Sequence, residues 1–140
     1  MRQYAQAEKI LRKRIEQEWD AHLVALYGEI ITDKPERILK KLESWAVGHE
    51  HDPGLGIARA RQCMQAGLWG QARTMINDVL KDNPSPTLYN LLADVDERLG
   101  DKKRSLSNRR AGLDLAAAKP GDVLYRLENG IDIFQADPQK

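Results

Sequence analysis

Cysteine, valine, threonine and long apolar runs are all scarce in this chain. One residue of 140 is cysteine, which excludes an intrachain disulfide and a multi-cysteine zinc site. No apolar run approaches the roughly 20 residues that a membrane-spanning helix needs, and the charged first 20 residues do not have the pattern of a secretory signal. Lys and Arg total 22 against 21 Asp and Glu, so the overall field gives no reason to expect nucleic-acid or membrane binding. We expect this stretch of chain to be soluble.

Helix-forming residues dominate what is present. There are 17 Leu and 15 Ala but only 5 Val and 3 Thr, and apolar residues recur three or four positions apart, without sustained alternation. One such stripe consists of Leu88, Leu92, Val95 and Leu99. The sequence therefore predicts an all-α protein. The expected helices lie near residues 2–18, 20–31, 34–47, 53–66, 69–81, 86–99, 101–119 and 122–134.

Capping residues mark where several of these helices begin and end. Asp33 and Glu36 have the three-residue spacing of a capping box, with Pro35 in the first turn between them. Asp52-Pro53 and Ser85-Pro86 each place a capping side chain immediately before a first-turn proline. The glycines expected to stop helices in a left-handed conformation are Gly48, Gly67 and Gly100.

These signals repeat along the chain. Pro53 and Pro86 are 33 residues apart, and so are Gly67 and Gly100. A helix-turn-helix unit with this period predicts an α-solenoid of antiparallel helix pairs, in which each pair is too thin to bury its apolar face alone. We expect one such domain over residues 1–134, followed by a frayed tail at 135–140.

The unit that begins at Pro53 resembles a tetratricopeptide repeat (TPR). It departs from the pattern at Gly56, where a large residue is usual, and the next unit has Ser105 in place of alanine and Arg109 in place of an aromatic residue. The positions that match are Ala60, Gly67, Ala72 and Pro84.

Further segments, spread over residues 5–118, resemble the C-terminal part of the proteobacterial HemY-type proteins. They are Leu26-Tyr27-Gly28 followed by Pro35-Glu36-Arg37, the run 63–73, Pro84-Ser85-Pro86 and the run 98–101. The resemblance implies a TPR scaffold associated with protoheme biogenesis, anchored in the bacterial inner membrane by helices upstream and facing, preferentially, the cytoplasm. It also implies late heme-biosynthesis enzymes, or a membrane-associated heme-handling complex, as partners.

The first helices of such repeats line a concave groove. We expect a non-enzymatic protein–protein interaction module whose groove holds a segment of a partner, with Arg61 and Arg98 pairing with its carboxylates. The register places these residues toward the groove: Tyr27, Ile31, Arg61, Gln65, Asn90, Asp94 and Arg98.

Three alternatives stay open. The family context and the cluster His49-Glu50-His51-Asp52 make direct heme or porphyrin binding conceivable, although we expect a solvated loop there and no metal or cofactor. The chain could instead mediate self-association. Basic clusters could also touch anionic lipid weakly. Enzyme loop signatures are missing, and no aromatic residues alternate with the basic clusters as in a nucleic-acid binder.

Overall fold

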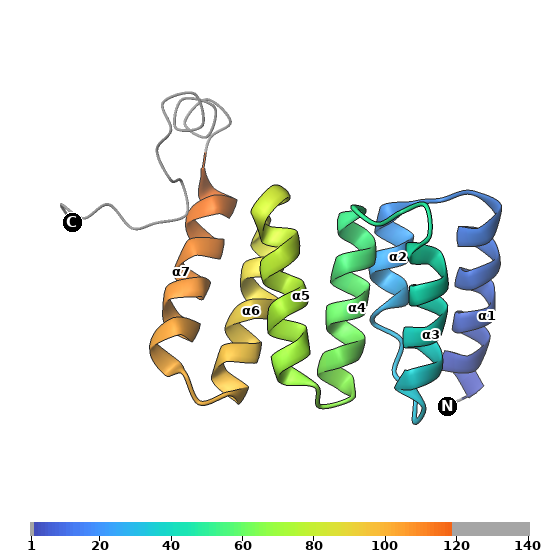
Figure 1. The fold of residues 1–140 in the computed structure, drawn as a ribbon, viewed down its shortest axis with the longest axis horizontal. Helices are drawn as coiled ribbons and strands as arrows, with labels where there is room; N and C mark the ends of the chain where they lie inside the picture. Colours follow the sequence, from blue (N-terminus) through green and yellow to red (C-terminus); the bar gives the residue numbers. More distant parts are fainter. Residues whose placement is uncertain (1, 119–140) are drawn as a thin grey trace. The chain divides into compact units, whose positions relative to one another are not determined.

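In the computed structural model, the described part of the chain, residues 2–118, is all-α, as the sequence predicts. It contains seven helices and no strand (Figure 1). The eighth helix expected at 122–134 and the tail at 135–140 lie outside the described residues. The helices are α1 (Arg2–Gln17), α2 (Ala21–Tyr27), α3 (Pro35–Ala46), α4 (Pro53–Gln65), α5 (Trp69–Asp82), α6 (Pro86–Arg98) and α7 (Lys102–Ala117).

The chain divides into two compact units, Met1–Asn83 and Pro84–Lys140. In the first unit, α4 packs against α2, α3 and α5, and α1 packs against α2. In the second unit, α6 packs against α7. Each unit is therefore built from neighbouring helices, while the stacking of both into one solenoid domain stays a prediction.

The expected caps of α4 and α6 are confirmed. Asp52 accepts a hydrogen bond from the backbone N–H of Leu55 at 3.0 Å, and the Ser85 hydroxyl accepts one from Leu88 at 3.2 Å. These bonds satisfy N–H groups that have no partner within the first turn of a helix. The glycine stops are also confirmed, because Gly48, Gly67 and Gly100 have φ values of 91°, 76° and 83°.

The capping box expected at Asp33 is wrong. The residue at the cap of α3 is Lys34, and no side chain caps this helix. Instead, the hydroxyl of Thr32 accepts a hydrogen bond from the Lys34 N–H at 3.1 Å. This bond forms a local turn just before the helix. The start of α3 therefore depends on Pro35, which fixes φ for the first turn.

The second helix is shorter than the predicted range 20–31, because α2 ends at Tyr27. The side-chain amide of Gln62 on α4 donates to the carbonyl oxygens of Gly28 and Ile30, at 2.9 and 3.0 Å. These carbonyls therefore find partners without further helix, and the chain turns into a loop at residues 28–34.

The core of the first unit combines aliphatic and aromatic side chains. The ring centroids of Tyr27 and Trp45 are 4.9 Å apart, and Trp19 meets Trp45 edge-on at 6.0 Å. The buried core residues are Ile15, Val24, Tyr27, Ile30, Ile38, Leu42, Trp45, Leu55 and Ala58. They come from α1–α4 and the loop after α2, so this loop is part of the core.

The apolar stripe of α6 is confirmed except at its end. Leu88, Leu92 and Val95 are buried, whereas Leu99 is 44% exposed. Leu99 is the C-cap of α6 and lies beyond its last helical residue.

Candidate functional site

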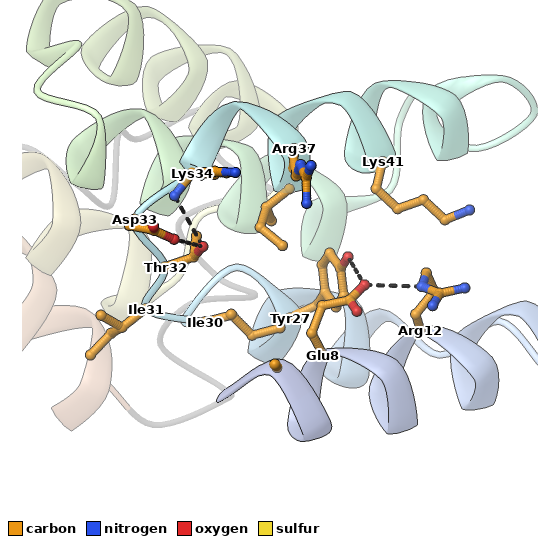
Figure 2. A pocket seen from close by; sticks show the side chains of 12 residues that line it. Glu8, Arg12, Tyr27, Ile30, Ile31, Thr32, Asp33, Lys34, Arg37 and Lys41 are labelled. Atoms are coloured by element: carbon orange, nitrogen blue, oxygen red, sulfur yellow. Dashed lines mark hydrogen bonds and ion pairs between the residues drawn. The ribbon is translucent and has the colours of Figure 1, made fainter. Parts of the chain in front are cut away.

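A cleft of about 640 Å³ lies between α1 and α3, bounded at one end by the loop that joins α2 to α3 (Figure 2). We call it the α1–α3 cleft. Its volume is in the range of small-ligand and side-chain pockets in proteins. All of its lining residues belong to the first unit.

The floor of the α1–α3 cleft is apolar. Tyr27, Ile30 and Ile38 line it and are almost fully buried. Ile31, the next residue along the loop, also lines the cleft but is 56% exposed. The cleft therefore offers an accessible aliphatic side chain beside a rigid apolar floor.

The wall on the α1 side is held by hydrogen bonds to Glu8. The Tyr27 hydroxyl donates to the Glu8 carboxylate at 2.8 Å, and the Arg12 guanidinium donates to the same oxygen at 3.0 Å. Burial, together with Glu8, raises the pKa of Tyr27 well above its ordinary value. The phenol is thus a neutral donor at physiological pH, and its ring stays fixed in the floor.

Cations surround the opening. Arg12, Lys34, Arg37 and Lys41 line the cleft, against two carboxylates. Arg12 pairs with Glu8 on α1. Lys34 and Arg37, both exposed, have no ion-pair partner among residues 2–118, so their charge is available to a ligand.

Lys41 is the fourth of these cations and is partly neutralised. It pairs with Glu16 across the helices, and this contact lowers the pKa of Glu16. Its ammonium also lies 5.7 Å from the centroid of the Trp45 ring. Lys41 therefore joins α3 to α1 and closes the end of the cleft away from Lys34.

Of the residues predicted to face a groove, Tyr27 and Ile31 line the α1–α3 cleft. Arg61 on α4 is engaged within the first unit instead. Its guanidinium donates to the Ala25 carbonyl at 2.9 Å and pairs with Glu29 at 3.2 Å. Arg61 therefore anchors α2 and the start of the following loop to α4.

Gln65 serves the same loop. Its side-chain amide donates to the Ile30 carbonyl at 2.8 Å, next to the bond from Gln62. The sequence predicts Gln65 as a groove residue that binds a partner protein, whereas in the structure its amide bonds the loop that carries Ile30 and Ile31. Gln65 positions the floor of the cleft and does not line it.

The other three predicted residues lie on α6, in the second unit. Arg109 on α7 donates to Asn90 at 3.3 Å and to Asp94 at 2.8 Å, and it also meets Glu97 at 3.2 Å. Arg98 is exposed in the last turn of α6. One groove that contains all seven residues stays a prediction, because the two sets belong to different units.

Sequence reasoning missed Lys34 and Arg37 as candidate binding residues. Their signal is the end of α2 at Tyr27, followed by two cations that flank Pro35 at the start of the next helix. The sequence predicted helix over 20–31, so most of the loop at 28–34, which forms the end of the cleft, was not expected.

Two residues of the cluster His49-Glu50-His51-Asp52 contact Trp19 within the first unit. The His49 ring is stacked on Trp19, with centroids 3.7 Å apart and planes at 3°. Asp52 accepts from the Trp19 indole N–H at 2.8 Å in addition to capping α4. Within the described residues, no group of three or more His, Cys, Asp or Glu side chains could hold a metal ion.

Comparison with protein-family models, with curated proteins and with solved structures finds no match to this chain. Over the part of the chain that the structure describes, no helix has both the length and the apolar character to cross a bilayer.

Proposed function

We propose that this chain is a non-enzymatic protein-interaction module, and that its α1–α3 cleft receives a segment of a partner protein. The observation that carries this proposal is the cleft itself, in which the exposed Ile31 lies beside the apolar floor of Tyr27, Ile30 and Ile38. An accessible aliphatic side chain over a preformed apolar floor is the usual anchor point for a partner's apolar residue.

The setting we propose is the one implied by the resemblance to HemY-type proteins. The chain would then be a TPR array near the bacterial inner membrane, and its partners would be late heme-biosynthesis enzymes. The 33-residue repetition of Pro53 with Pro86, and of Gly67 with Gly100, supports the array. The native reading frame tests the family assignment, because apolar spans upstream of this region are expected.

The experiment for the cleft compares Ile31→Asp with Val47→Asp. Both side chains are exposed, at 56% and 82%, and Val47 lies at the end of α3 outside the cleft. Each variant is immobilised, and retention of late heme-biosynthesis enzymes from solubilised membranes is measured. We expect Ile31→Asp to weaken retention about tenfold, because a carboxylate replaces the apolar anchor, and Val47→Asp to leave it unchanged. Equal retention by both variants would exclude the cleft as the docking site.

A further inference from the structure

Resting on this proposed function, we infer that the partner segment is acidic: it carries a carboxylate next to an apolar residue, and Lys34 and Arg37 recognise that carboxylate. The proposal goes beyond the cleft's apolar floor, because it assigns a charge to the partner and a recognition role to two residues.

The first argument is the charge of the lining. Four cations line the cleft together with two carboxylates, Glu8 and Asp33, and a third carboxylate, Glu16, pairs with one of the cations, so the excess is one positive charge. Two of the cations are already paired, Arg12 with Glu8 and Lys41 with Glu16. The excess charge therefore belongs to Lys34 and Arg37, which Asp33 offsets only in part.

The second argument is the position of this charge. Figure 2 shows Arg37 and Lys41 on α3 across the opening from Glu8 and Arg12 on α1. Lys34 and Arg37 lie at the start of α3, directly after the loop that carries Ile31, so the two unpaired cations and the exposed aliphatic anchor follow one another in the chain and line the same cleft. A guanidinium can bind a carboxylate through two parallel hydrogen bonds, so Arg37 can hold a carboxylate while the next side chain of the peptide reaches the apolar residues of the cleft.

The same features disfavour an extended polyanion or a lipid surface. Glu8 and Asp33 lie among the cations and would repel a run of phosphates. A flat membrane surface would also leave the buried floor at Tyr27 and Ile38 uncontacted. A peptide can place one carboxylate at the rim and one apolar side chain over the floor at the same time.

The test measures, by fluorescence anisotropy, the binding of a short fluorescein-labelled peptide that has one leucine next to one glutamate and otherwise only alanine and glycine. The variant Lys34→Glu/Arg37→Glu is compared with Lys13→Glu/Arg14→Glu, which makes the same charge change at exposed positions of α1 outside the cleft. We expect saturable binding to the unmodified chain that weakens as NaCl is added. We expect binding to Lys34→Glu/Arg37→Glu to be at least about tenfold weaker than binding to the Lys13→Glu/Arg14→Glu control.

Two further probes make the result decisive. The peptide with glutamine in place of glutamate should bind at least about tenfold more weakly, and vesicles containing phosphatidylglycerol should not compete with the glutamate peptide. Equal binding of both peptides, equal loss in both double variants, absence of saturable binding, or displacement by the vesicles would overturn the proposal. Enzyme retention that depends on Ile31 but not on Lys34 and Arg37 would leave the proposed function standing and remove only the acidic partner.

Discussion

The α4–α5 hairpin of the first unit and the α6–α7 hairpin of the second have the same frame and different interiors. Each starts with a first-turn proline, Pro53 or Pro86, behind a capping side chain. Each turns through a glycine of positive φ, Gly67 or Gly100. Equivalent positions are 33 residues apart, so the two interiors can be compared residue by residue.

One pair of facing residues has its glycine on the first helix in one hairpin and on the second helix in the other. In α4–α5 the first helix has Gly56, and a Cβ there would lie 2.2 Å from Cγ2 of Val79 on α5. In α6–α7 the equivalent first-helix residue is Tyr89 and the residue facing it is Gly112, where a Cβ would lie 3.1 Å from Cβ of Tyr89. Gly56 departs from the TPR pattern, and its partner on α5 supplies the missing volume.

A second pair of facing residues contains sulfur atoms in one hairpin and hydrogen-bonding polar groups in the other. In α4–α5 the thiol of Cys63 lies 3.7 Å from the sulfur of Met75, and burial raises the pKa of Cys63. The equivalent pair in α6–α7 is Asp96 and Asn108, joined by a hydrogen bond of 2.7 Å. Facing positions therefore change together, so the hairpin geometry is kept by matched pairs and not by any one residue type.

The largest expected effect comes from giving α4–α5 the tyrosine of the other hairpin. Gly56→Tyr should destabilise the first unit by about 3 kcal/mol or more, because the ring would overlap Val79. Gly56→Tyr/Val79→Gly should recover a large part of this loss. Urea unfolding followed by tryptophan fluorescence measures it in the first unit alone, because Trp19, Trp45 and Trp69 all precede residue 84.

Gly70→Ala is the matched control for this experiment. Apart from its two chain neighbours and the backbone of its own helix, no atom lies within 4 Å of a Cβ placed at Gly70. The substitution should therefore be neutral or slightly stabilising. If Gly56→Tyr proves as harmless as Gly70→Ala, the size exchange between the hairpins is not a packing constraint.

The next effect concerns the polar pair. Asn108→Met should cost about 2 kcal/mol, because it removes the amide that bonds the buried Asp96 carboxylate. Asp96→Cys/Asn108→Met, which copies the α4–α5 pair, should be less harmful than Asn108→Met alone. Urea unfolding followed by circular dichroism measures this loss of stability. A double variant worse than the sum of its single substitutions would argue against exchangeable pairs.

A smaller effect is expected where Ser105 replaces the alanine of the repeat pattern. Its hydroxyl donates to the Ala93 carbonyl at 2.9 Å, and the equivalent residue in α4–α5 is the fully buried Ala72. Ser105→Ala should cost about 1 kcal/mol or less, since one hydrogen bond is lost and no cavity forms. Urea unfolding followed by circular dichroism would check this value, and a loss as large as that of Asn108→Met would contradict it.

The smallest effect is expected in the segments that precede the two hairpins, which differ in their contacts. Before α4 the chain stacks His49 on Trp19, whereas Pro84 and Ser85 precede α6. His49→Ala should lower the stability of the first unit by about 0.5–1 kcal/mol through loss of the stacked ring. The exposed neighbour His51 provides the control, because His51→Ala should change stability by less than about 0.5 kcal/mol in the same fluorescence-detected unfolding.

The sequence predicted several features that depend on a few neighbouring residues, although the local capping-box signal at Asp33 failed. Asp52-Pro53 and Ser85-Pro86 cap their helices, and Gly67 and Gly100 end theirs, because cap and turn geometry are set locally. The 33-residue period follows from these same signals, which is why the helical hairpins could be predicted at all.

Features that depend on distant residues could not be predicted in this way. The end of α2 at Tyr27 is stabilised by Gln62, which lies more than 30 positions further along the chain. The α1–α3 cleft depends on that loop, so sequence reasoning missed Lys34 and Arg37. Tyr27 and Ile31 were predicted from the repeat register as residues of a concave groove, not as residues of this cleft. Arg61 was expected to bind a partner, yet its guanidinium already bonds the Ala25 carbonyl.

Photo-crosslinking tests the docking of a partner segment in the α1–α3 cleft most directly. A benzophenone side chain is placed at position 31 or at position 47, and each chain is irradiated with solubilised inner membranes. We predict adducts with late heme-biosynthesis enzymes from position 31 that an excess of the leucine–glutamate peptide suppresses, and none from position 47. Adducts of equal yield from both positions, or adducts from position 31 that the peptide leaves unchanged, would contradict it.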